Sequence, residues 1–259
     1  MQVEVVRVFT RGPEGGNHLG IVDQLLGDGD MQAIAAEVGF SETIFFDPAE
    51  SEPAVRIFTP TSELPFAGHP LVGLTWWLGR IGRPTTLVTG VGPVSVRSFG
   101  DRAEVDAALG QPVSEGAEPP SGLPPGADCA VVSMPLPYVV CDLGDPEAVS
   151  AVQPGAGWAH VYVHAMQPDG IVRARFLSSG LGIPEDPATG SAAVALAARR
   201  AAGGTGSGRL TIHQGEEMGH PSRIDVSWGG GIATIGGTVV AEEPMQIRRP
   251  SGPLRTSTP

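Results

Sequence analysis

The chain of 259 residues contains no lysine, and all sixteen of its basic residues are arginine. This absence excludes enzymes that use a lysine Schiff base, a lysine nucleophile or the lysine of a phosphate-binding P-loop. The 28 acidic residues outnumber the basic ones and give a formal net charge of −12. Nucleic acids and anionic membrane surfaces attract positively charged proteins, so neither is predicted as a partner.

Cysteines and long apolar runs are also scarce. The two cysteines, Cys129 and Cys141, lack zinc-type spacing and are too few for a disulfide scaffold, so we expect both to be reduced. No apolar run reaches membrane-spanning length, and the opening "MQVEVVRVF" alternates like a strand and lacks the features of a signal peptide. A cytoplasmic location is therefore expected.

The sequence offers little for metal, nucleotide or serine-nucleophile chemistry. His160 and His164 in "AHVYVHAM" are four residues apart on an expected strand, which separates them by roughly 13 Å, too far to share a metal. "GGTGSG" (203–208) follows an expected helix, which is the wrong context for dinucleotide binding, and no G-x-S-x-G motif occurs. We therefore predict no metal and no cofactor.

The order of predicted elements in the first half of the chain recurs in the second half. "VRIFTP" (55–60) leads into "ELPFAGHPLVGLTWWLGRIG" (63–82), and "VRARFL" (172–177) leads into "EDPATGSAAVALAARRAAGG" (185–204). Each pair predicts a strand, a Pro-x-x-Gly turn and a helix without a polar face, which is typical of a buried helix. The pattern predicts an α+β fold of two pseudo-symmetric halves, each a barrel-like mixed sheet around a central hydrophobic helix. A chance likeness of two glycine-rich turns is the alternative.

A segment rich in proline and glycine separates the two halves. It is "QPVSEGAEPPSGLPPGA", residues 111–127, and it predicts a linker. The predicted domains are residues 1–110 and residues 128–239.

The starts of the two predicted helices form the candidate site. When the halves are aligned, Gly68 meets Gly190. Helix N-termini carry unpaired N–H groups and partial positive charge, so two converging starts would hold a small acid and stabilise an enolate-like charge. Asp186, Thr189 and Ser191 crowd the second start, and we expect Asp186 and Ser191 to point into the site. Ordinary helix capping would explain the same residues.

Glu42 and His69 are the candidates for proton transfer. "GFSETIFFDP" (39–48) alternates as a strand with Phe40, Glu42, Ile44 and Phe46 on one face, so loss of water should raise the pKa of Glu42. A carboxyl with a raised pKa can both take and return a proton. A glutamate facing solvent at a strand edge is the alternative. At its helix start, where the dipole disfavours a charged ring, a neutral His69 would transfer a proton or orient the substrate.

Several segments resemble a known family in order and spacing. "FSETIFF", "FTPTSELPFAGHP", "DPATGSA" and "HQGEEMGHPSRIDV" are similar to the signature segments of the phenazine-biosynthesis PhzF family, which has the diaminopimelate epimerase-like fold. The resemblance ends near residue 248, leaves residues 249–259 as a tail, and adds a strand near 240–248 to the first domain. It implies a cofactor-independent, usually homodimeric isomerase of a small amino-carboxylate such as trans-2,3-dihydro-3-hydroxyanthranilate.

The resemblance also implies the site residues, with Glu42 as the acid/base that moves the proton. The implied catalytic residues are Glu42, His69, Asp186 and Ser191. The implied substrate-binding residues are Asn17, Gly68, Thr189, Gly190, Gln214 and Gly215. The chain departs from the family at His18 and Leu19, where Pro-Ala is usual, and at His220, where arginine is usual. We expect both departures near the substrate.

Two other functions remain open. A racemase or epimerase of the same fold would need Asp186 or His69 as a second base opposite Glu42, because both helix starts lack the cysteines that such enzymes use. A non-catalytic small-acid-binding or interaction protein would keep the cleft without turnover. Exchange of α-protons without isomerisation would identify the first, and binding without proton exchange would identify the second.

Overall fold

The computed structural model describes residues 1–82, 85–181 and 183–248, so the predicted tail at 249–259 lies outside the described residues. The helices are α1 (Asp28–Val38), α2 (Gly68–Gly79), α3 (Pro146–Ala151), α4 (Gly190–Ala202) and the short 3₁₀ helix η1 (Ser179–Leu181). In this part of the chain, no helix is long and apolar enough to span a membrane.

Strands dominate the fold, which is an α+β arrangement. The first nine are β1 (Gln2–Val8), β2 (Asn17–Val22), β3 (Glu42–Phe46), β4 (Val55–Phe58), β5 (Glu63–Leu64), β6 (Thr86–Thr89), β7 (Gly92–Phe99), β8 (Arg102–Ala108) and β9 (Gln111–Ala117). The others are β10 (Asp128–Ser133), β11 (Tyr138–Asp142), β12 (Val161–Met166), β13 (Val172–Ser178), β14 (Ile183–Asp186), β15 (Gly208–Gln214), β16 (Ser222–Gly229), β17 (Ile232–Ala241) and β18 (Met245–Gln246).

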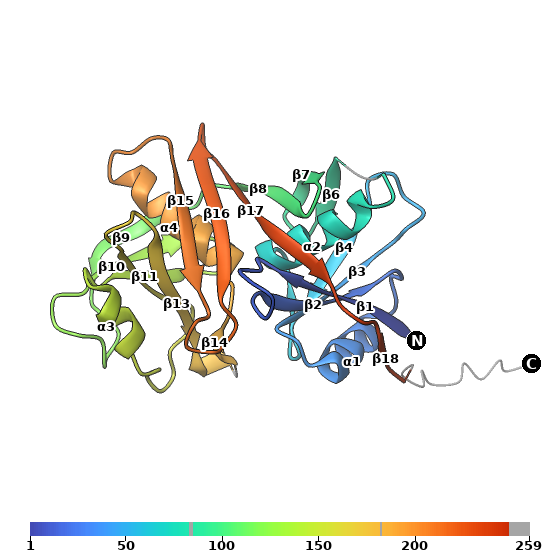
Figure 1. Ribbon diagram of the computed structural model, residues 1–259, viewed down its shortest axis with the longest axis horizontal. Helices are drawn as coiled ribbons and strands as arrows, with labels where there is room; N and C mark the ends of the chain where they lie inside the picture. The colour runs from blue at the N-terminus through green and yellow to red at the C-terminus, as the bar shows by residue number, and fades with distance from the viewer. Residues whose placement is uncertain (83–84, 182, 249–259) are drawn as a thin grey trace, which may run out of the picture.

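The elements form two lobes joined by long strands (Figure 1). We call β1–β7 with α1 and α2 the N-terminal lobe, and β9–β16 with α3 and α4 the C-terminal lobe. β17 crosses between them, because its first part pairs with β16 and β8 and its end pairs with β1. β18 then pairs with the first residues of β1, so the chain finishes on the lobe where it began.

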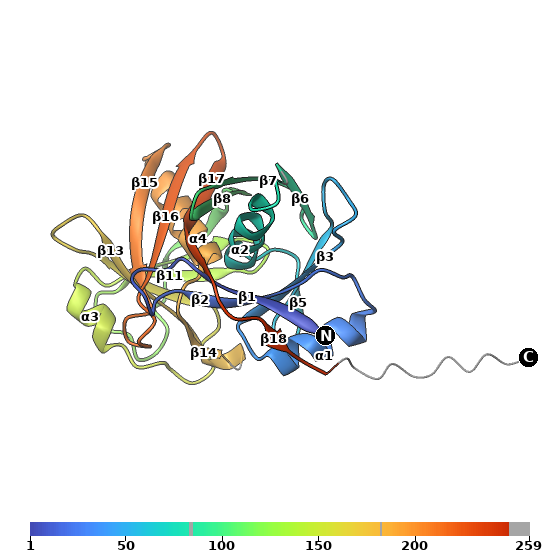
Figure 2. The same ribbon diagram turned by 45° about the vertical axis from the view of Figure 1, so that its right-hand side comes forward.

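The two predicted apolar helices, α2 and α4, are buried. Burial covers residues 68–76 and residue 78 of α2, and Gly190 together with residues 192–198 of α4. α2 packs against strands of the N-terminal lobe and α4 against strands of the C-terminal lobe, while both contact β17. Figure 2 shows the two helices side by side, with β8 and β17 passing close to them. A helix that is apolar on all sides needs such cover on all sides.

The predicted linker at 111–127 needs correction. Its first seven residues form β9, which pairs antiparallel with β10. The prolines at 119, 120, 124 and 125 lie after this strand, in the turns that lead to β10. The segment therefore begins as part of the C-terminal sheet, because a single proline at the start of a strand does not prevent pairing at a sheet edge.

The prediction of reduced cysteines is also wrong. Cys129 and Cys141 form a disulfide that joins β10 to β11. The two residues are cross-strand partners in the antiparallel ladder, with 4.1 Å between their Cα atoms. Their spacing along the sequence carried no sign of this register, which arises only when the strands pair.

Candidate active site

The starts of α2 and α4 touch each other, as the sequence predicts. A Cβ atom placed on Gly68 would lie 3.2 Å from the Cα of Gly190 and 2.4 Å from Cδ1 of Ile235. A Cβ atom on Gly190 would lie 3.3 Å from the Cα of Gly68. Only glycine at both positions allows this approach, so the N–H groups that begin the two helices converge on one place.

Ordinary capping does not account for the polar residues at these starts. Thr189 is the N-cap of α4, but its side chain makes no capping hydrogen bond, and its hydroxyl donates instead to Asp186 Oδ2 at 2.5 Å. Ala67 is the N-cap of α2 and has no side chain that could cap. Both helix starts are therefore available to an anionic group.

A cavity of about 310 Å³ lies beside the helix starts, between the two lobes. Three of the four predicted catalytic residues, Glu42, Asp186 and Ser191, line it. Thr189 lines it too, whereas His69 is buried behind Glu42. The sequence therefore placed its main polar candidates at one cavity.

Glu42 and His69 form a hydrogen-bonded pair. His69 Nδ1 lies 3.0 Å from Glu42 Oε2, and its Nε2 lies 3.2 Å from the carbonyl oxygen of His18. A carbonyl oxygen can only accept, so Nε2 carries a proton and the pair shares a further proton between Nδ1 and the carboxyl. When Glu42 is ionised, Nδ1 donates to it, and the ring is held between the carboxyl and the His18 carbonyl.

The expected upward shift of the Glu42 pKa is wrong. Burial acts to raise the pKa, but the hydrogen bond and charge of His69 outweigh burial, and the pKa lies below its ordinary value of 4.5. Glu42 keeps some contact with the cavity, since 17% of its side chain is exposed. It is thus a carboxylate ready to accept a proton.

Asp186 has the raised pKa instead. It ends β14, is 7% exposed, and accepts a hydrogen bond from Asn17 Nδ2 at 2.8 Å. Burial and then the negative charge of Glu42 raise its pKa to about 6, against the charge of His69 and the hydrogen bonds from Thr189 and Asn17. Two carboxyls with opposite shifts thus face one cavity, an arrangement suited to proton transfer.

Three of the predicted substrate-binding residues support Asp186 and do not line the main cavity. The Nε2 atom of Gln214 donates to the Asp186 carbonyl at 2.7 Å and to Thr189 Oγ1 at 3.0 Å, and Gln214 is fully buried. Gly215 has φ 83°, and a Cβ there would lie 2.6 Å from the Pro187 carbonyl oxygen. Asn17 reaches Asp186 from the N-terminal lobe.

Sequence reasoning missed an aromatic wall of the cavity. Tyr138 lines it, and its hydroxyl lies 2.7 Å from Ser191 Oγ. His160 and Phe176 also line it, with ring centroids 5.3 Å and 5.9 Å from that of Tyr138. The sequence pattern places His160 on a strand, but the residue precedes β12 and has φ 49°. Nothing in its local sequence signals that conformation.

Of the family departures, His18 and His220 lie in a neighbouring cavity of about 430 Å³, whereas Leu19 is fully buried in the core. Their ring centroids are 6.1 Å apart, and His18 stacks on Phe40 at 5.2 Å. Ser41 and Asp186 line both cavities. His18 and His220 therefore share a cavity with Asp186, and the His18 carbonyl also contacts His69, the partner of Glu42.

His164, which the sequence pairs with His160, does not line the main cavity. It is buried in β12, where burial lowers its pKa to about 4. Across residues 1–82, 85–181 and 183–248, no three His, Cys, Asp or Glu side chains gather as a metal site would require.

Comparison with known proteins identifies the family. A family model described as phenazine biosynthesis-like protein (PhzC–PhzF) matches residues 6–122 and 135–240. An uncharacterised isomerase of Mesorhizobium japonicum is 33% identical, covering 90% of this chain and 94% of its own. The trans-2,3-dihydro-3-hydroxyanthranilate isomerase of Pseudomonas aeruginosa is 32% identical, covering 85% and 87%. A PhzF-family crystal structure from Bacillus anthracis superposes with a TM-score of 0.81 at 22% identity, covering 96% and 99%. The chain belongs to the PhzC–PhzF family of phenazine biosynthesis-like proteins.

Proposed function

We propose that the protein is a cofactor-independent isomerase that moves a proton within a small amino-carboxylate. The observation that carries the proposal is the pair of carboxyls at one cavity, with Glu42 held ionised by His69 and Asp186 kept protonated to higher pH. The Pseudomonas aeruginosa relative supports trans-2,3-dihydro-3-hydroxyanthranilate, or a close analogue, as the substrate class.

In the proposed reaction, Glu42 takes the proton from C3 of the ring and returns it to C1. The electron pair of the broken C3–H bond enters the ring π system, and a new C1–H bond forms. The resulting enol then tautomerises to a ketone. The substrate carboxylate sits against the starts of α2 and α4, with Ser191 oriented by the Tyr138 hydroxyl.

The proposal extends to the architecture. We infer that residues 1–110, with the strand near 240–248, and residues 128–239 are two copies of one repeat around α2 and α4. The glycine contact between the helix starts supports this arrangement, because it sits where the copies would meet. The family resemblance adds a homodimer, and sedimentation equilibrium of the purified protein tests the dimer. The cytoplasmic location remains a proposal that rests on the lack of a signal-peptide pattern, because the Cys129–Cys141 disulfide removes its other ground.

A second candidate is an epimerase of the same fold, with Asp186 as the second base. The observation in its favour is the Asp186 pKa of about 6, which lets that group hold or release a proton near neutral pH. An epimerase would exchange an α-proton and invert the carbon without moving a double bond.

Proton NMR in D₂O tests both candidates. Purified protein is incubated with a panel of dihydroaromatic acids and cyclic amino acids, and the position of deuterium is read from the spectra. We expect incorporation at a ring carbon with a shifted double bond, and its loss in Glu42→Gln. Glu147→Gln, at an exposed glutamate on α3, is the control that keeps the rate. Absence of any exchange across the panel would contradict both candidates.

A further inference from the structure

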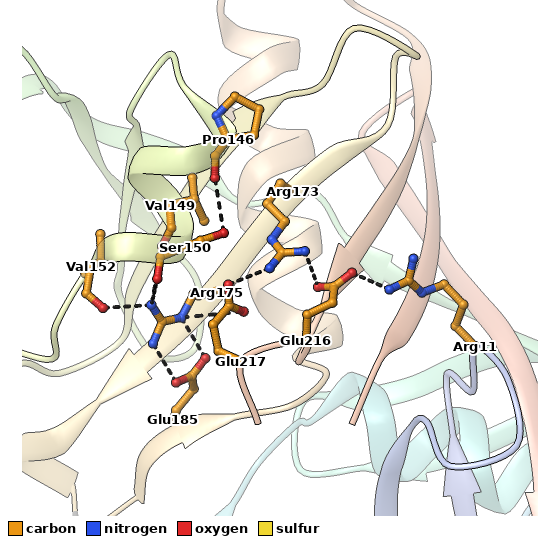
Figure 3. A network of polar contacts seen from close by, with 10 residues as sticks. All are labelled: Arg11, Pro146, Val149, Ser150, Val152, Arg173, Arg175, Glu185, Glu216 and Glu217. Atoms are coloured by element: carbon orange, nitrogen blue, oxygen red, sulfur yellow. Dashed lines mark hydrogen bonds and ion pairs between the residues drawn. The ribbon is translucent and has the colours of Figure 1, made fainter. Parts of the chain in front are cut away.

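A chain of alternating charges runs behind the cavity (Figure 3). Three arginines and three glutamates alternate along it, and most of their side chains are poorly exposed. From the N-terminal lobe to β14, they are Arg11, Glu216, Arg173, Glu217, Arg175 and Glu185. None of these residues lines the main cavity. This series of charged side chains ends at Glu185, the residue before Asp186.

Arg175 and Glu185 form its tightest contact. Nε and Nη2 of Arg175 each donate to a separate oxygen of Glu185, both at 2.8 Å. The side chains are 5% and 13% exposed. A two-point pair between planar groups fixes orientation as well as distance, which a single ion contact does not.

The third guanidinium nitrogen anchors Arg175 from the other side. Nη1 donates to the carbonyl oxygens of Val149, Ser150 and Val152, at 3.3, 3.2 and 2.7 Å. These carbonyls belong to the last turn of α3 and the residue after it, where helix carbonyls lack partners within the helix. Arg175 is thus clamped between a helix end and β14, and Glu185 is held in one place.

Glu185 immediately precedes Asp186 on β14. Successive side chains of a strand point to opposite faces, so a fixed Glu185 on one face determines where Asp186 points on the other. The neighbouring strand β13 shows the same alternation, because Phe176 pairs with Asp186 and shares its face of the sheet. Phe176 follows Arg175 and lines the cavity with Asp186.

We propose that Arg175 is a positioning residue, which holds Glu185 and thereby directs the Asp186 carboxyl into the cavity toward Glu42. The effect of Arg175 on turnover rests on the proposed function. The effect of Arg175 on the orientation of Asp186 does not, because it follows from the contacts of Arg175 with Glu185 and α3 alone.

The rest of the charge chain extends the clamp to the other lobe. Arg173 pairs with Glu217 at 2.5 Å and with Glu216 at 2.9 Å. Glu216 also pairs with Arg11, which follows β1 in the N-terminal lobe. Arg175 and Glu217 are 3.9 Å apart, the widest link in the chain. Substitutions beyond this link should therefore move Asp186 less than those at Arg175.

The test is a ¹³C NMR titration of the Asp186 carboxyl, assigned with Asp186→Asn. In the native protein it should titrate near pH 6. In Arg175→Gln, β14 is released, so the carboxyl gains water and moves away from the negative charge of Glu42. Its pKa should fall toward the ordinary 3.8. Arg175→Lys keeps the charge without the two-point contact and should give a smaller fall.

Arg97→Gln is the matched control. Arg97 makes a similar two-point contact with Asp106, at 3.1 and 2.7 Å, but on the exposed β7–β8 hairpin. It should leave the Asp186 titration unchanged. If Arg175→Gln does not fold, Glu185→Gln removes the same contact with a smaller change and should lower the pKa in the same direction.

Two results separate this inference from the proposed function. A folded Arg175→Gln or Glu185→Gln variant in which Asp186 still titrates near pH 6 overturns the positioning role, whatever the activity. A native protein without proton exchange, in which Arg175→Gln nevertheless lowers the pKa, overturns the function and leaves the positioning role standing. Where both hold, kcat of Arg175→Gln measured above pH 6 should drop by about tenfold for each unit by which the Asp186 pKa falls, because the protonated fraction of Asp186 drops by that factor.

Discussion

The two lobes each contribute one poorly exposed carboxyl to the same cavity, and the pKa values of the two groups shift in opposite directions. Glu42 of the N-terminal lobe is held below its ordinary value, while Asp186 of the C-terminal lobe is raised to about 6. Burial acts on both in the same sense. The difference comes from their partners. His69 is hydrogen-bonded to Glu42, whereas Asp186 accepts its hydrogen bonds from a neutral amide and a hydroxyl and feels the charges of Glu42 and His69 with opposite effects.

This contrast shows that burial alone does not decide the direction of a carboxyl pKa. A charge-assisted hydrogen bond at 3.0 Å outweighs loss of water for Glu42. Two neutral donors do not outweigh it for Asp186. The two carboxyls are therefore suited to different roles: Glu42 can accept a proton, and Asp186 retains a proton to higher pH.

The largest expected effect comes from neutralising each carboxyl in turn. Glu42→Gln removes the group that moves the proton, so we expect a loss of about 10²–10⁴ in kcat, with substrate binding largely intact. Asp186→Asn keeps a neutral side chain close to the protonated form and should cost much less. Stopped reactions in D₂O give kcat, and calorimetric titration gives binding. An Asp186→Asn loss as large as that of Glu42→Gln would favour the epimerase.

Substituting His69 should bring the pKa values of Glu42 and Asp186 closer together. His69→Gln keeps a donor near Glu42 but removes the positive charge, so the pKa of Glu42 should rise, because the factor that opposed burial is gone. Loss of a charged hydrogen bond predicts about a 10- to 100-fold fall in rate on the acidic side. The acidic limb of the pH–rate profile should move to higher pH. An unmoved limb would show that Glu42 does not depend on His69.

The two carboxyls should also affect stability with opposite signs. Asp186 has a raised folded pKa, so the folded state binds its proton more tightly than the unfolded state, and its contribution to stability falls as pH rises from about 4 to about 6. The Glu42 pKa is lowered, so its contribution is full above its ordinary value and is lost as pH falls below it.

Urea unfolding across this pH range measures both contributions. Relative to the native protein, Asp186→Asn should gain stability as pH rises from about 4 to about 6. Glu42→Gln should lose stability relative to the native protein as pH rises toward 4.5 and should run parallel to it above that pH. Parallel curves for the native protein and Asp186→Asn would mean that the Asp186 pKa is not raised in the folded state.

The sequence predicted those parts of the site that depend on local pattern. The alternation around Glu42 placed Ile44 and Phe46 in the core on its own face, and the apolar helices α2 and α4 are buried as expected. Gly68 and Gly190 were recognisable because close backbone approach leaves glycine as the only residue that fits.

Other features depend on contacts between distant segments and left no local signal. His69 reaches Glu42 from 27 residues away, and its effect on the Glu42 pKa could not be read from a strand pattern. His160 enters the cavity because its backbone leaves the extended region just before β12. The Cys129–Cys141 disulfide depends on a strand register that spacing alone does not fix.

The smallest expected effects come from adding a Cβ atom at each of the two helix starts. A Cβ on Gly68 would meet Cδ1 of Ile235 at 2.4 Å, whereas one on Gly190 would meet it at 3.0 Å. Gly68→Ala should therefore destabilise by about 1–3 kcal/mol and Gly190→Ala by less, since overpacking costs grow with the displacement required. A Cβ on Gly29 in α1 would have no neighbouring atom within 4 Å, so Gly29→Ala should instead stabilise by about 0.5–1 kcal/mol.

Urea unfolding of the three alanine variants ranks these effects at a single pH. Ile235 lies on β17, the strand that contacts both helices, so any relief of the Gly68 clash must move an element shared by the two lobes. For that reason Gly68→Ala should also weaken carboxylate binding, while Gly29→Ala should leave it unchanged. Equal stability of Gly68→Ala and Gly190→Ala would mean that both helix starts tolerate an added Cβ atom equally well. Gly68 on α2 would then not be the more tightly packed of the two glycines.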